Sequence, residues 1–118
     1  MTELEGKKAN KSELEEMLLE QIRRRGLPEP MQEYKAVLET TGRKWAWDMA
    51  WVEQRLLVEV QGGTFMRKSH HSTGTGIHRD LLKANTAVEL GWRLLSFDSP
   101  MVKSGEAVGT IERMLKGG

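Results

Sequence analysis

The sequence predicts an α/β domain in which helices flank a mixed β-sheet, in the element order α-β-β-β-α-β-α. Three observations support this fold class. Apolar residues recur at helical spacing in three segments, they alternate with a period of two in others, and glycine or proline separates the segments. A chain of 118 residues is large enough for one hydrophobic core and too short for two. We therefore expect a flexible lead-in over residues 1–10 and a single domain over residues 11–118.

The first helix is expected to begin at Ser12, because serine followed three residues later by Glu15 is the pattern of a capping box. Apolar residues at helical spacing follow the cap: Leu14, Met17, Leu18 and Ile22. Gly26 and two nearby prolines end the helix.

Three strands are expected next. The first covers residues 31–38, and a turn around Gly42 separates it from the second, residues 45–51, where tryptophan and methionine alternate with smaller residues. Residues 56–61 alternate again and form the third strand. The segment 52–55 between the last two strands is short enough for a hairpin.

The sequence pattern in the second half of the chain predicts two helices and one strand. Residues 62–76 are rich in glycine, serine, threonine and histidine, which indicates a long loop. A helix over residues 77–90 then ends at a glycine. A short buried strand covers residues 92–97, and after a D-S-P turn a last helix covers residues 102–115.

Composition excludes several classes of protein. The chain contains no cysteine, so disulfides, thiolate catalysis and zinc–cysteine sites are excluded and carboxylate and imidazole chemistry remain. The net charge of +1 indicates no class of partner by itself. No apolar run approaches membrane-spanning length, and the polar N-terminal segment lacks the apolar core of a signal peptide. We therefore expect a cytoplasmic protein without a membrane partner.

Two carboxylates are expected to face each other across the hairpin. If the connection closes symmetrically, Trp51 pairs with Leu56, and the same register brings Asp48 opposite Glu59. Cross-strand partners point to the same face, with Cβ atoms about 4.5–5.5 Å apart. Two like charges at that separation destabilise a sheet, so a compensating group is expected.

A divalent cation such as Mg²⁺ is the expected compensating group, because this hard ion binds carboxylates together with water and phosphate oxygens. A shared proton, or a nearby arginine such as Arg43 or Arg55, is an alternative. The other alternative is a half-exposed sheet on which both carboxylates face solvent.

The order of these residues resembles the PD-(D/E)XK nuclease superfamily, with Asp48 as the first acid and Glu59-Val60-Gln61 in place of (D/E)-X-K. Several segments also resemble small phage and prophage endonuclease-like proteins related to the very-short-patch-repair group: S-E-L-E, G-L-P-E-P, R-K-W-A-W-D-M-A-W, L-L-V-E-V-Q-G-G, G-T-G, D-L-L-K-A-N and G-W-R-L-L-S-F. The resemblance covers most of the chain from residue 12 onward. It implies a restriction-endonuclease-like core.

The resemblance also implies roles for individual residues. Asp48 and Glu59 would hold Mg²⁺, for which Mn²⁺ can substitute, and Glu15 on the first helix would support them. The alternative role of Glu15 is the capping box with Ser12.

One position departs from the family pattern. Gln61 stands where lysine is usual, and its amide carries neither a positive charge nor a transferable proton. Gln61 is expected to orient the attacking water, and Lys83 in the next helix is the expected substitute for the missing lysine. The alternative is a solvated Lys83 that pairs with Asp80 on the same helix.

A basic segment follows the predicted third strand. Residues 62–79 include no acidic side chain. We expect the segment to contact DNA phosphates through four residues: Arg67, Lys68, His70 and Arg79. His71 is expected to assist catalysis, because the pKa of histidine lies near neutral pH. The alternative is a mobile loop whose histidines are merely polar.

The predicted site and the resemblance together predict a Mg²⁺-dependent endonuclease or nickase that hydrolyses phosphodiester bonds. The resemblance implies DNA as the substrate and a bacterial host cell as the location, with a phage as one source of the gene. The alternative is a DNA-binding or interaction module that keeps the nuclease fold without cleavage, as Gln61 suggests. A third interpretation is a subunit that is active only as a homodimer or in a larger complex, since cutting both strands of a duplex needs two copies of one small domain.

Overall fold

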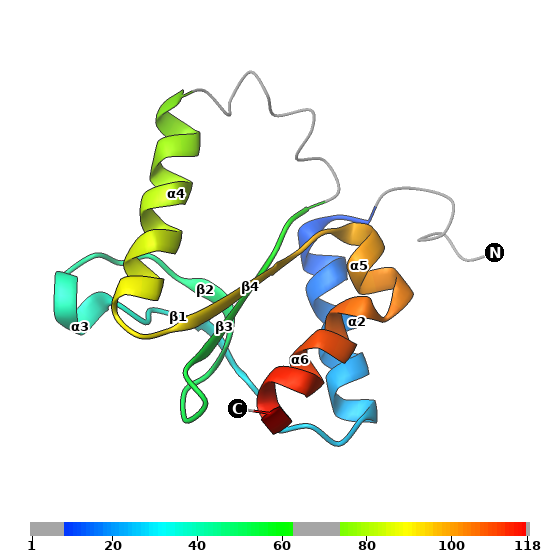
Figure 1. Cartoon of the computed structure of the whole chain (residues 1–118). Coiled ribbons are helices and arrows are strands. Elements are labelled where there is room, and N and C mark those ends of the chain that lie inside the picture. The colour runs from blue at the N-terminus through cyan, green and yellow to red at the C-terminus, as the bar shows by residue number, and fades with distance from the viewer. Residues whose placement is uncertain (1–8, 63–73, 118) are drawn as a thin grey trace. The chain divides into compact units, whose positions relative to one another are not determined.

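The computed structural model describes residues 9–62 and 74–117. Their fold is α/β, as predicted, with a four-stranded mixed sheet in the order β1-β2-β3-β4 (Figure 1). The strands are β1 (Met31–Tyr34), β2 (Trp47–Trp51), β3 (Leu56–Val60) and β4 (Arg93–Phe97). Strand β2 is antiparallel to both β1 and β3, whereas β3 and β4 run parallel.

The helices follow the predicted order, with one addition and one division. They are α2 (Lys11–Arg24), α3 (Leu38–Thr41), α4 (Gly74–Glu89), α5 (Ser99–Ser104) and α6 (Glu106–Gly117). The short helix α3 was not predicted. Among the residues that the structure describes, no helix is both long and apolar enough to cross a membrane.

The chain divides into two compact units. Of the described residues, the first unit contains 9–29, 60–62 and 96–117, and the second contains Pro30–Glu59 and 74–95. Helices α2, α5 and α6 belong to the first unit. Helices α3 and α4, strands β1 and β2 and most of β3 and β4 belong to the second.

The first unit is held together by the apolar faces of its three helices. Helix α2 contacts both α5 and α6, and the helix residues buried in this unit are Leu14, Leu18, Leu19, Ile22, Val102, Ala107, Val108 and Ile111. An ion pair of 2.8 Å between Arg25 and Glu112 connects the end of α2 to α6. The apolar spacing recognised in the sequence is therefore the packing surface of these helices.

The cap of α2 differs from the prediction. Asn10 is the N-cap: its side chain accepts from the Glu13 N–H at 2.8 Å, and its own N–H donates to the Glu13 carboxylate at 2.9 Å. The sequence contains two overlapping capping-box patterns, Asn10 with Glu13 and Ser12 with Glu15, and the helix uses the earlier one. Glu15 therefore has no part in the cap.

The last helix is divided and begins earlier than predicted. The D-S-P segment is not a free turn, because Asp98 caps α5 by accepting from the Met101 N–H at 3.1 Å, with proline in the first turn. Gly105 then ends α5 in the left-handed conformation, with φ of 89°. Helix α6 starts at the next residue.

The second unit contains an aromatic and aliphatic core. One cluster of its buried residues contains Val37, Trp47, Ala50, Leu57, Ala87 and Trp92. All five residues of β2 are buried, so both faces of this strand are covered. The tryptophan stripe of β2 is core.

The hairpin between β2 and β3 has the predicted register, with Trp51 paired to Leu56. Residues 52–55 close it, and the Arg55 N–H donates to the Val52 carbonyl at 3.1 Å. Arg55 occupies the left-handed region, with φ of 54°, as tight turns of this kind require.

Two other boundaries differ from the predicted ones. Strand β1 ends at Tyr34 rather than at residue 38, because the chain turns into α3 there. Helix α4 starts at Gly74, three residues before the predicted start. The rest of the predicted loop, residues 63–73, lies outside the described part of the chain.

The choice of cap can be tested by mutation. Asn10→Ala is expected to lower the free energy of unfolding by about 1 kcal/mol, since it removes both capping hydrogen bonds. Ser12→Ala is the matched control, because Ser12 is exposed inside the first turn, and its effect should stay within about 0.5 kcal/mol. Chemical denaturation measures both. A larger effect of Ser12→Ala would contradict the assignment.

Candidate functional site

The pairing of β2 with β1 and with β3 brings acidic residues next to Asp48. Strand β1 pairs with β2 through Gln32 with Met49 and Tyr34 with Trp47. The residue between the two on β1 is Glu33, and the residue between the two on β2 is Asp48. The same register therefore brings these two carboxylates opposite each other.

The other neighbour of β2 gives a second such pair. Met49 pairs with Val58 and Ala50 with Leu57, so one further step of this register brings Asp48 opposite Glu59. This is the register that the hairpin predicted. Asp48 thus lies between two glutamates, one on each neighbouring strand.

Asp48 is buried. Its relative exposure is 5%, and it is the one charged residue in the buried class among those that the structure describes. The alternative of a solvent-facing Asp48 is therefore wrong. A carboxylate in such surroundings requires compensation by hydrogen bonds or an opposite charge.

Glu33 is an acidic neighbour of Asp48 within the second unit. One carboxylate oxygen of each lies within 4.8 Å of the other. Glu33 is exposed and has φ of 50°, a left-handed conformation that costs a residue with a side chain about 1–3 kcal/mol. Strained residues of this kind cluster at functional sites. Both the backbone conformation and the carboxylate of Glu33 therefore make this position a candidate for a functional site.

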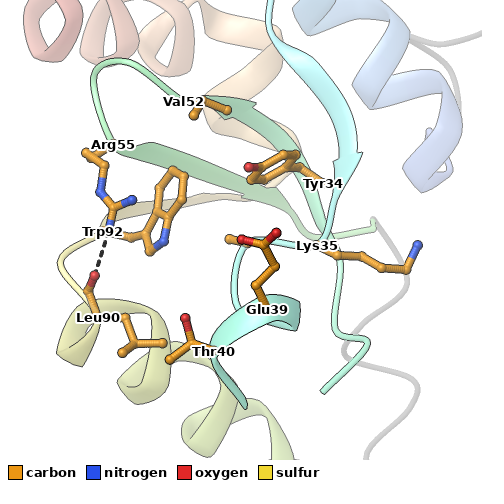
Figure 2. A pocket seen from close by; sticks show the side chains of 9 residues that line it. Tyr34, Lys35, Glu39, Thr40, Val52, Arg55, Leu90 and Trp92 are labelled. Atoms are coloured by element: carbon orange, nitrogen blue, oxygen red, sulfur yellow. Dashed lines mark hydrogen bonds between the residues drawn. The ribbon is translucent and has the colours of Figure 1, made fainter. Parts of the chain in front are cut away.

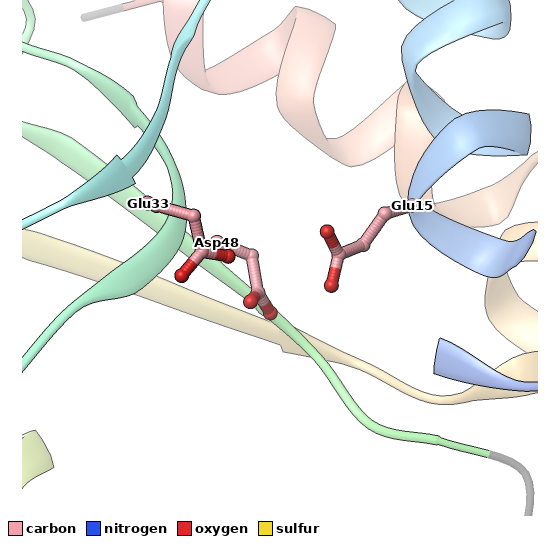
Figure 3. A group of neighbouring side chains, drawn as sticks. All are labelled: Glu15, Glu33 and Asp48. Atoms are coloured by element: carbon pink, nitrogen blue, oxygen red, sulfur yellow. The ribbon is translucent and has the colours of Figure 1, made fainter. Parts of the chain in front are cut away.

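Figure 3 draws this pair together with Glu15. Glu15 belongs to α2 of the first unit, its side chain is 19% exposed, and Lys11 lies 3.6 Å from one of its oxygens. Within the second unit the candidate metal ligands are therefore Glu33 and Asp48. Both offer carboxylate oxygens, the donor type that a hard divalent cation prefers.

Glu59 has a cationic partner. The Lys83 ammonium on α4 lies 3.3 Å from a carboxylate oxygen of Glu59 and donates to the Ala46 carbonyl at 2.8 Å. It also lies 4.8 Å from the centre of the Trp47 ring. Both side chains of the ion pair are 20% exposed, so water screens it only in part. Lys83 is thus directed at the sheet and not at Asp80.

The two arginines considered as compensating charges have other roles. The Arg43 guanidinium stacks on Trp45 at 4.6 Å, and that of Arg55 stacks on Trp92 at 4.2 Å. Arg55 also donates to the Leu90 carbonyl at 2.6 Å. In the hairpin the opposite charge beside Glu59 comes from Lys83.

The remaining predicted residues are dispersed. Gln61 follows β3 directly, is exposed, and its backbone N–H donates to the Phe97 carbonyl at 2.8 Å. Arg79 is exposed on α4. The others lie outside the described residues: Arg67, Lys68, His70 and His71.

Glu33 was missed in the sequence. Its strand was predicted, but the connection from β1 to β2 is long, and a long connection does not fix a register as a hairpin does. The signal in the sequence was the alternation of side chains along the two strands. This alternation is compatible with several registers between them, so it does not identify the residue opposite Asp48.

No known protein family, curated protein or solved structure matches this chain in the comparisons that were made. The resemblance to the nuclease superfamily therefore depends on the sequence motifs. The geometry adds a small α/β fold and a group of candidate acidic ligands.

The acidic pair predicts a response to divalent cations. Glu33→Gln removes one of two neighbouring negative charges, so without metal the free energy of unfolding should rise by about 0.2–1 kcal/mol. Its affinity for Mg²⁺, measured as metal-induced thermal stabilisation, should fall at least about tenfold. Glu53→Gln is the control, because Glu53 is an exposed hairpin residue. Equal Mg²⁺ stabilisation of both variants would contradict this ligand assignment.

The Lys83 contacts predict a loss of stability. Lys83→Met keeps the apolar stem over Trp47 but leaves two acceptors without their donor, which should cost about 1–3 kcal/mol. Adding Glu59→Gln should recover part of this loss, and the double-mutant cycle measures the coupling. Lys44→Met, at an exposed position, is the control. Strict additivity of the two substitutions would show that the ion pair does not stabilise the fold.

Proposed function

We propose that the protein is a metal-dependent DNA endonuclease or nickase that hydrolyses phosphodiester bonds. The observation that carries the proposal is the buried carboxylate of Asp48, which has a glutamate opposite it on each neighbouring strand. Such an arrangement is costly in a sheet unless a cation balances it. The nuclease motifs in the sequence identify the same aspartate.

In this proposal Asp48 and Glu33 bind a divalent cation and Glu59 is a further candidate ligand, while Glu15 keeps the supporting role that the nuclease resemblance implies. A bound Mg²⁺ or Mn²⁺ lowers the pKa of a water molecule and offsets the negative charge that develops on the phosphate during hydrolysis. The strand backbone supplies rigidity, because Asp48 is fixed by pairing on both sides.

Lys83 takes the role for which Gln61 is unsuited. An ammonium group has three N–H donors, and the contacts with Glu59 and the Ala46 carbonyl account for two of them. The third can donate to a phosphate oxygen and stabilise its charge. Glu59 and the carbonyl then act as positioning groups that hold the ammonium beside the acidic residues.

DNA would be held by basic residues through its phosphates. Arg79, exposed on α4, is one contact, and the basic residues predicted between positions 62 and 79 are the others. His71 keeps its proposed role as a proton donor to the leaving oxygen.

The second candidate function is a DNA-binding module without cleavage. The specific observation in its favour is Gln61, which stands at the usual lysine position and exposes an uncharged side chain. In this version the acidic residues bind a cation that stabilises the fold.

A plasmid assay separates the two candidates. The parent protein with Mg²⁺ or Mn²⁺ is expected to convert supercoiled plasmid to open-circle or linear DNA, and EDTA should prevent this. Asp48→Asn and Lys83→Met should each lower the rate about 100-fold or more, because each removes a group that stabilises charge in the transition state. Asp80→Asn is the matched control, since Asp80 is exposed on α4 and should keep the parent rate.

Each outcome has a separate meaning. Loss of cleavage in a folded Asp48→Asn protein supports the proposed metal chemistry, and the product form distinguishes a nickase from a double-strand nuclease. A parent protein that retards DNA in gels but cuts with neither metal would support the binding module. A parent that neither binds nor cuts DNA would overturn both functions.

A further inference from the structure

A second feature of the second unit is a cavity with aromatic walls, about 320 Å³ in volume. Its lining combines flat rings with polar groups: Tyr34, Lys35, Ala36, Glu39, Thr40, Val52, Arg55, Leu90 and Trp92. Figure 2 shows these side chains around one space. The volume lies at the lower end of the range of about 300–1,000 Å³ for small-molecule sites.

Aromatic rings form one side of the cavity. The rings of Tyr34 and Trp92 lie 5.9 Å apart and are tilted by 59°. Arg55 stacks on the indole and is held there by the Leu90 carbonyl. The Trp92 ring is thus fixed in place, and a flat ring in the cavity would contact rigid aromatic surfaces, as bases do in nucleic-acid-binding proteins.

Three polar groups of the cavity are available to a ligand. The carboxylate of Glu39, the hydroxyl of Tyr34 and the indole N–H of Trp92 have no hydrogen-bond partner among the described residues. In Figure 2 the Glu39 carboxylate is directed toward the space beside Tyr34, and the indole nitrogen is on the side of its ring that faces Glu39. An acceptor and donors therefore face a ligand together.

We propose that this cavity binds a guanine base. A carboxylate only accepts hydrogen bonds, and guanine is the common base whose pairing edge presents two adjacent N–H donors, N1–H and the N2 amino group. Adenine and cytosine place a ring acceptor beside their amino donor, which would face the carboxylate with an unfavourable contact. The indole N–H and the tyrosine hydroxyl are then available to the acceptors O6 and N7 of guanine.

The guanine can come from a free nucleotide or from a base turned out of a DNA strand. Both sources present the same base to the cavity, and the experiment below distinguishes them. The location of the cavity does not by itself favour one source. Tyr34 of the cavity is the neighbour on β1 of Glu33 in the acidic pair, so a strand that carries the base would also bring phosphates to that strand of the sheet.

The test is equilibrium binding, by tryptophan fluorescence and calorimetry, of GMP, AMP and CMP and of an oligothymidine with or without one central guanine. GMP should bind more tightly than AMP and CMP. Glu39→Gln should weaken GMP binding about tenfold or more, because it replaces an acceptor-only carboxylate that two donors require. Tyr34→Leu should weaken it about fivefold or more through lost stacking. Glu53→Gln, on the exposed hairpin, should bind like the parent.

The outcomes are decisive for the cavity and independent of the nuclease reaction. Binding of GMP that depends on Glu39 supports the proposal with a free nucleotide as the source, and binding of the guanine-containing strand alone supports it with DNA as the source. Equal affinity for the three nucleotides, or a Glu39→Gln protein that binds guanine like the parent, would overturn it. Asp48→Asn should retain guanine binding whether or not the parent cleaves plasmid.

Discussion

The burial of one carboxylate is the constraint on which the rest of the structure depends. Strand β2 is buried along its full length and still carries Asp48. A charge in that position costs free energy unless it is balanced. Antiparallel pairing on both sides brings the Glu33 and Glu59 positions opposite it. A sheet selected for stability alone would carry an apolar residue at the buried Asp48 position, so this carboxylate is the candidate functional group of the sheet.

The cations of the second unit are distributed in two ways. Arg43 and Arg55 stack on tryptophan rings and extend the aromatic packing. Lys83, in contrast, pairs with Glu59 of the sheet. Since its ammonium also contacts the backbone of the segment before β2, it links helix α4 to both strands of the hairpin. Packing and electrostatics of the hairpin therefore depend on the same side chain.

Strand β1 connects the two features proposed as binding sites. Glu33 carries one of the acidic groups, and Tyr34, the next residue, lines the aromatic cavity. Glu33 adopts a left-handed conformation within the strand, and the chain leaves the sheet after Tyr34 to form α3, which carries Glu39. One irregular strand thus presents acidic and aromatic groups in consecutive positions.

The sequence by itself determined the fold class, the order of most elements and the register of the β2–β3 hairpin, because helical spacing, alternation and a four-residue connection are local properties. The pairing of Trp51 with Leu56, and with it the opposition of Asp48 and Glu59, followed from that connection alone. Local rules left the cap of α2 ambiguous, since Asn10 and Ser12 both begin a capping-box pattern.

Tertiary structure decided the remaining features. The position of Glu33 depends on how β1 pairs with β2 across a long connection, and the partner of Lys83 depends on how α4 packs against the sheet. Both contacts join residues far apart in the chain, and their geometry is set by the packing of the core rather than by neighbouring residues. The sequence therefore identified Asp48, and only the folded chain showed which side chains lie beside it.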